Sequence, residues 1–95
     1  MENAIGKYGM LHLDYIKTYR KGTYATLIME GRLNDYLLQI DANARKTVSR
    51  LVKEYAEQRR INEQMKATDP MRWVQEMNNC KACAEDFVLK EMVYA

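Results

Sequence analysis

One apolar stripe between residues 33 and 56 constrains the fold more than any other feature of the sequence. Its members follow one another at intervals of three or four residues: Leu33, Leu37, Ile40, Ala44, Val48, Leu51 and Tyr55. Because an α-helix has about 3.6 residues per turn, this spacing puts the whole stripe on one helix face. The pattern predicts a helix from about residue 32 to residue 59, with Val52 and Ala56 widening the apolar face.

A second long helix is predicted to start at the pair Asp69-Pro70. An Asp accepts hydrogen bonds from the free amides at a helix start, and Pro suits the first helical position, where an N–H is not needed. The helix is expected to run to about Tyr94. Its apolar face consists of Trp73, Met77, Cys80, Ala84 and Phe87, broadened by Val74, Val88 and Met92. We expect Trp73, Met77 and Tyr94 to be structural.

Shorter helices are predicted on the N-terminal side. Tyrosines and a leucine at helical spacing indicate a helix over about 9–20, which ends near Gly22. Thr23 is expected to be the N-cap of a second short helix over 24–29, which Gly31 closes. Residues 60–69 form a connection, in which Asn62 caps one short turn.

These elements predict an all-α fold, a small helical bundle with two short N-terminal helices and two long antiparallel helices. Two long helices joined by about ten residues fold back on each other. A chain of 95 residues makes one domain at most. We therefore expect a single domain over residues 1–95, with a flexible N-terminus of about residues 1–8.

The composition also indicates the compartment. No apolar run approaches the ~20 residues that span a bilayer, and residues 1–10 do not resemble a signal peptide. Two cysteines are too few for a disulfide framework and suit a reducing compartment. We expect a cytoplasmic protein that does not enter a membrane.

Residues with catalytic or metal-binding chemistry are few. Cys80 and Cys83 have CxxC spacing, but a structural zinc site needs a second pair, and a redox pair usually opens a helix. A packing role is therefore favoured over redox or metal use. His12, the only histidine, has no nucleophile or ligand beside it, and we expect a partly exposed helix residue. We predict no enzyme, metal, cofactor or small-molecule substrate.

The basic residues are the first candidates for a function. Residues 1–60 carry a net charge of +4 and residues 61–95 one of −2, which allows an acidic partner for the first part. A helix, a Gly turn and a second helix over residues 23–38 also resemble a helix-turn-helix, in which Arg pairs with guanine and Asn with adenine. The candidate DNA-binding residues are Lys17, Arg20, Lys21, Arg32, Asn34, Lys46, Arg50 and Lys53.

Two other interpretations stay open. The same cations can belong to solvated helix faces that bind nothing. Against DNA binding, Asp35 and Asp41 would face or approach phosphates and repel them. The apolar seam of Trp73, Met77 and Phe87 can be core, or it can contact a partner or a second copy in a homodimer. Its spacing of four and three residues is the one that a coiled-coil contact needs.

Several blocks of the sequence, in this order, resemble one known family. They are residues 19–24 (YRKGTY), 31–37 (GRLNDYL), 73–79 (WVQEMNN) and 92–95 (MVYA). Residues 62–67 (NEQMKA) fit the same pattern, with Asn62 where a capping Thr or Ser is expected. From about Leu11 to Ala95 the chain is similar to the TnpV family of small proteins encoded on bacterial transposons.

The resemblance implies an accessory protein of a mobile element rather than the recombinase itself. Recombinases need nucleophiles and carboxylates that are missing here. We therefore expect a protein that assists transposition or excision by contacting DNA, a transposon recombinase or both. The alternative is a helical protein-interaction module that does not bind DNA.

Overall fold

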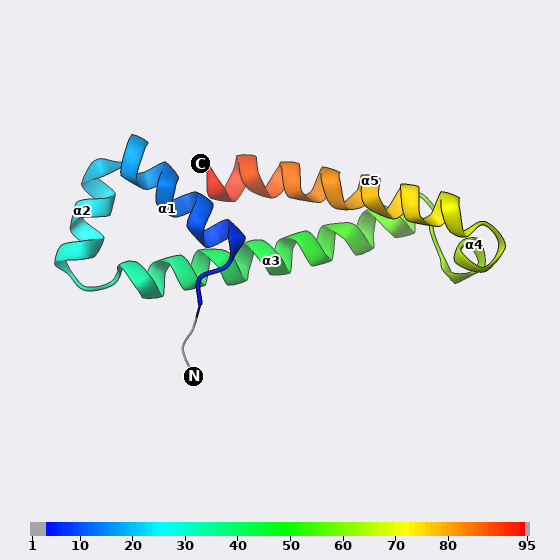
Figure 1. The fold of residues 1–95 in the computed structure, drawn as a ribbon, viewed down its shortest axis with the longest axis horizontal. Coiled ribbons are helices and arrows are strands. Elements are labelled where there is room, and N and C mark those ends of the chain that lie inside the picture. Colours follow the sequence, from blue (N-terminus) through cyan, green and yellow to red (C-terminus); the bar gives the residue numbers. More distant parts are fainter. Residues whose placement is uncertain (1–3, 95) are drawn as a thin grey trace. The chain divides into compact units, whose positions relative to one another are not determined.

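The computed structural model describes residues 4–94, and all regular structure in this part of the chain is helical. In chain order the elements are α1 (Lys7–Tyr19), α2 (Lys21–Met29), α3 (Leu33–Gln58), α4 (Glu63–Thr68), α5 (Pro70–Val88) and the π-helix η1 (Leu89–Val93) (Figure 1). The all-α prediction is confirmed. None of the described helices combines the length and the apolar character needed to cross a membrane.

The chain packs as two compact units, which are described separately. The first unit contains α1, α2, the first part of α3 up to Arg45, and η1. The second unit runs from Lys46 to Val88 and contains the rest of α3 with α4 and α5. A single domain over residues 1–95 stays a prediction, and the expected flexible segment 1–8 lies partly outside the described residues.

In the first unit, α1 begins two residues earlier than predicted, because a residue on another helix caps it. The N-cap Gly6 has extended backbone and no side chain with which to accept a hydrogen bond. Instead, the carboxylate of Asp41, on α3, accepts the N–H of Gly9 at 3.1 Å. A Cβ at Gly9 would lie 2.9 Å from the carbonyl oxygen of Leu37, so glycine permits this close approach of α1 to α3.

The prediction that Asp41 approaches phosphates is wrong. Its side chain is buried, and its second oxygen accepts a hydrogen bond from Nε of Arg45 at 2.9 Å. Asp41 is therefore an internal cap for the start of α1. An acidic residue that looked unfavourable for DNA binding is in fact withdrawn from the surface.

The prediction of a partly exposed His12 is also wrong. His12 is buried, with Nδ1 2.7 Å from the carbonyl oxygen of Val93 and Nε2 2.8 Å from the hydroxyl of Tyr36. Because a carbonyl can only accept, Nδ1 carries the hydrogen of the bond to Val93. One side chain thus connects α1, α3 and η1, where a continuous α-helix to Tyr94 had been expected.

The boundaries of α2 are partly as predicted. Thr23 is not the N-cap, because the chain breaks at Arg20 alone and α2 already starts at Lys21. The stop at Gly31 is confirmed, with a φ of 69°. The N–H groups of Gly31 and Arg32 bond back to the carbonyls of Ile28 and Leu27, which is a Schellman motif.

In the second unit, the local start signals are confirmed. Oδ1 of Asn62 accepts the N–H of Met65 at 3.0 Å and caps α4. Oδ1 of Asp69 accepts the N–H of Arg72 at 3.3 Å, with Pro70 as the first residue of α5. The end of α3 is a second Schellman motif, in which Arg60 takes the left-handed position with a φ of 56°.

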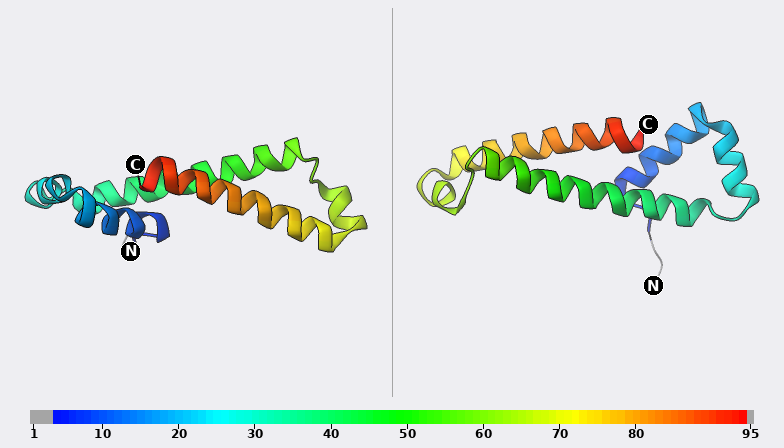
Figure 2. Two further views of the ribbon diagram at one scale, coloured as in Figure 1. Left: turned by 90° about the horizontal axis from the view of Figure 1, so that it is seen from above. Right: turned by 180° about the vertical axis from the view of Figure 1, so that it is seen from behind.

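The core of the second unit lies on one face of α5, where Cys80, Ala84 and Val88 are fully buried. Leu51 of α3 and Ile61, which precedes α4, are also buried. Within this unit α5 runs in the direction opposite to α3, and the two helices diverge toward the end that α4 connects (Figure 2). The predicted antiparallel arrangement therefore holds here.

Candidate functional site

The predicted DNA-binding residues of the first unit are all exposed and lie around α2. Arg20 and Lys21 stand at its start, Arg32 follows its end, and Asn34 is in the first turn of α3. Lys17, near the end of α1, has its ammonium group 5.7 Å from the centre of the Tyr24 ring. The structure thus brings cations to both ends of one short helix.

An open hollow lies along α2, beside the turn into α3. It has a volume of about 490 Å³ and is lined by Gly22, Thr23, Thr26, Leu27, Glu30 and Arg32. Threonine hydroxyls and an arginine are groups that contact phosphate oxygens in protein–DNA complexes. Nη1 of Arg32 bonds to Glu30 at 2.8 Å, with both side chains exposed. Such surface pairs contribute about 0–1 kcal/mol, so Arg32 can exchange this carboxylate for another anion.

The basic residues of the second unit share one face of α3, as their spacing predicts. Lys46, Arg50 and Lys53 are all exposed. Nη1 of Arg50 bonds to Glu54 at 2.8 Å, one turn further along. No ion pair of Lys46 or Lys53 occurs within residues 4–94. This group belongs to a different unit from the cations around α2.

The apolar seam of α5 is divided between core and surface. Trp73 and Met77 are half-buried, whereas Phe87 is 44% exposed. Trp73 lies in the first turn of α5, and the ammonium group of Lys66 on α4 sits 4.9 Å from the centre of its ring. Phe87 lies beside the buried stripe of Cys80, Ala84 and Val88 rather than within it. Trp73 therefore contributes to the core with only part of its side chain.

The two cysteines have different surroundings, and both are free thiols. Cys80 is fully buried in the apolar face of α5, and Cys83 is exposed. Within residues 4–94, no three His, Cys, Asp or Glu side chains are grouped closely enough to hold a metal ion.

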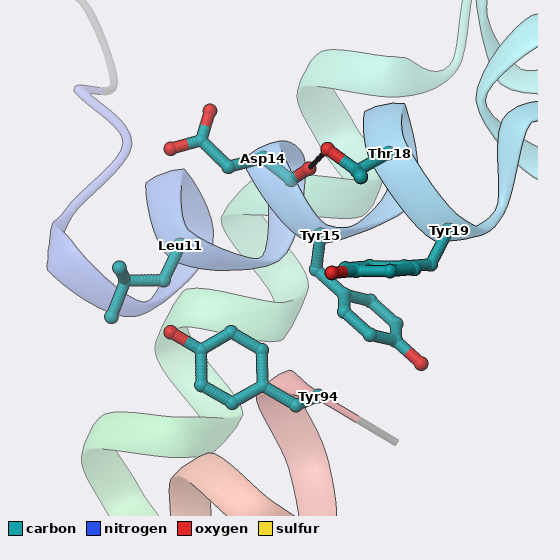
Figure 3. Close-up of a pocket in the computed structure, with 6 residues that line it drawn as sticks. All are labelled: Leu11, Asp14, Tyr15, Thr18, Tyr19 and Tyr94. Carbon is teal, nitrogen blue, oxygen red and sulfur yellow. Dashed lines mark hydrogen bonds between the residues drawn. The ribbon is translucent and has the colours of Figure 1, made fainter.

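A tyrosine-lined hollow in the first unit was not predicted from the sequence. It has a volume of about 470 Å³ and is lined by Leu11, Asp14, Tyr15, Thr18, Tyr19 and Tyr94 (Figure 3). The ring centre of Tyr15 lies 5.5 Å from that of Tyr19 and 5.8 Å from that of Tyr94. Tyr15 and Tyr19 are one turn apart, which the spacing indicates, but the approach of Tyr94 depends on tertiary structure.

Comparison with known proteins gives one family. No curated protein and no solved structure matches the chain significantly. The family model of the transposon-encoded protein TnpV matches residues 1–93 of the 95. The chain belongs to the TnpV family of transposon-encoded proteins.

Proposed function

We propose that this protein is a cytoplasmic, non-catalytic accessory factor that assists transposition or excision by contacting DNA, a recombinase or both. Membership of a transposon-encoded family supports the link to a mobile element. The DNA contact rests on one observation, the exposed cations at both ends of α2 with the threonine-lined hollow between them.

The length of α2 suits a duplex. A helix of nine residues is about 14 Å long at a rise of about 1.5 Å per residue. The major groove of B-DNA is about 12 Å wide. Arg20 and Lys21 at one end and Arg32 at the other can therefore reach phosphates on opposite sides of one groove. Asn34, exposed in the first turn of α3, is the candidate for base contact.

Salt dependence of binding tests this arrangement. A labelled duplex carrying the ends of the element is titrated with protein at several salt concentrations, and fluorescence anisotropy gives the affinity. The double variant Lys21→Ala/Arg32→Ala removes two phosphate contacts. The negative slope of log K against log salt is therefore expected to become shallower by about 2. The double variant Lys46→Ala/Lys53→Ala tests the basic face of the second unit in the same way.

The matched control removes two exposed cations from α5 instead. Arg72→Ala/Lys81→Ala changes the net charge by the same amount and should leave the slope nearly unchanged. If the slope becomes equally shallow in all the double variants, the salt dependence reflects net charge alone and not contacts at these positions. No binding at micromolar protein in low salt would remove the DNA contact from the proposal.

A protein-interaction module is the second candidate function, and the surface of α2 favours it. This helix is apolar around most of its circumference, yet Leu27 is its one buried residue. Ile28 and Met29 are 49% and 86% exposed. Light scattering tests self-association. A homodimer should become monomeric on Met29→Lys, and a strict monomer in the unmodified protein would argue against a second copy as the partner.

A further inference from the structure

We propose that the tyrosine-lined hollow of the first unit binds a lysine or arginine side chain of a protein partner. The site goes beyond the DNA contact proposed above, and it does not depend on that contact. It is built by the face of α1 that carries Tyr15 and Tyr19, together with Tyr94 after η1.

His12 lies behind part of the hollow. The ring of His12 lies 6.1 Å from that of Tyr15, with an angle of 28° between the planes. The same histidine bonds to the carbonyl of Val93, the residue directly before Tyr94. His12 therefore connects the Tyr15 side of the hollow, on α1, with the backbone that carries Tyr94.

The rings are also accessible. Tyr19 is 73% exposed and Tyr94 is 44% exposed, and the hollow between them opens to solvent. Figure 3 shows the three rings at different tilts, with the ring of Tyr15 next to those of Tyr19 and Tyr94. An open hollow of this kind suits a side chain that enters from a partner surface rather than an enclosed small molecule.

The lining of the hollow favours a cation over an anion. None of its six lining residues is basic, and Asp14 brings a carboxylate. No ion pair of that carboxylate occurs in the part of the chain that the structure describes. The face of an aromatic ring is negative and attracts ammonium and guanidinium groups.

Asp14 attracts the basic partner as it approaches and does not contact the ammonium or guanidinium group at the rings. Its carboxylate is at the rim and points away from the tyrosines in Figure 3. Lys17 contacts the ring of Tyr24 and does not line the hollow. A nucleobase could stack on the same rings, but none of the lining residues is a cation that could hold its phosphates. A basic protein segment is therefore the occupant that fits.

Peptide titration followed by NMR tests the site. The probe is the blocked tripeptide Gly-Arg-Gly, and its matched control replaces Arg with citrulline, which is similar in shape but neutral. The ring signals of Tyr15, Tyr19 and Tyr94 should shift saturably with the arginine peptide and far less with the citrulline peptide.

Three variants make the result specific. Tyr19→Leu keeps the bulk of an exposed side chain and should weaken binding about two- to fivefold, the usual size of an exposed cation–π contact. Tyr24→Leu removes a tyrosine outside the hollow and should leave the affinity unchanged. Asp14→Asn should weaken binding mainly at low salt. Circular dichroism checks that each variant keeps its helices.

Four outcomes would overturn the proposal. They are equal shifts with both peptides, no shift at millimolar peptide, stronger binding of oligothymidylate at the same ring signals, and shifts of these signals with protein concentration alone. The third would assign the rings to single-stranded DNA, and the fourth would assign them to a second copy.

Discussion

Replacing Asp41 should destabilise the protein far more than replacing an exposed charged residue of α3. The side chain is 2% exposed, and one carboxylate oxygen accepts the N–H of Gly9 in the first turn of α1. A hydrogen bond to a charged group contributes about 1.5–3 kcal/mol, and truncation leaves the buried N–H without an acceptor. The pair with Arg45 adds about 0–1 kcal/mol, because that arginine is 67% exposed. Asp41→Ala should therefore cost about 2–4 kcal/mol.

This loss is a large share of the ~5–14 kcal/mol expected for a chain of this length. Urea unfolding followed by circular dichroism at 222 nm, the usual α-helix band, measures it. Asp41→Asn keeps an oxygen for Gly9 but loses the charge, so it should cost about 1–2 kcal/mol. Arg45→Ala, the matched control, should cost under about 1 kcal/mol. If Arg45→Ala costs as much as Asp41→Ala, the carboxylate acts through its ion pair, and the capping argument is refuted.

Four further substitutions test other parts of the fold by the same unfolding assay, and the last is also followed by hydrogen exchange. Arg60→Gly should stabilise the protein by about 1 kcal/mol, since a left-handed backbone is strained for any residue with a Cβ; no gain would contradict this. Cys80→Ser should cost about 1–3 kcal/mol by burying a hydroxyl, whereas the exposed Cys83→Ser should stay within about 0.5 kcal/mol; equal effects would argue against a packing role. His12→Phe should cost about 1–3 kcal/mol by leaving two buried partners unpaired, and unchanged hydrogen-exchange protection of η1 would show that His12 does not hold that segment.

Sequence reasoning succeeded where the signal is local. Asn62 and Asp69 accept hydrogen bonds from the first turn of the helix that follows them, and Pro70 needs no N–H there. Neighbours in the chain therefore suffice to identify these helix starts. Gly31 is likewise a local signal, because a residue without a Cβ adopts the left-handed backbone readily. The long apolar stripes gave the helices and the class of fold for the same reason, since helical periodicity is a property of adjacent turns.

The errors concern residues whose partners are distant in the chain. Asp41 caps a helix 32 residues away, and His12 bonds to a carbonyl 81 residues away. No spacing rule connects such pairs, so both were assigned to the surface. The break at Arg20 was misplaced for a different reason. The chain changes direction there without a glycine, and Thr23, a good N-cap by type, is used inside the helix instead.

The candidate sites divide in the same way. All the predicted cations are exposed, as charged residues on a helix face usually are. The grouping of Lys17, Arg20, Lys21 and Arg32 around α2 depends on the break between α1 and α2, which the sequence indicates but which lies at Arg20, earlier than predicted. The tyrosine-lined hollow needs Tyr94 beside α1, and only the tertiary fold brings that residue there.

The bond from His12 to Val93 sets an order for biosynthesis. A ribosome that has just released α1 has not yet made residues 89–93, so the imidazole has no acceptor, and the first unit stays unfinished until those residues have emerged. Contacts of such long sequence separation slow folding, because a large loop must close first. Nascent chains stalled before residue 89 should therefore lack the protease resistance of this unit, however well α1 forms locally.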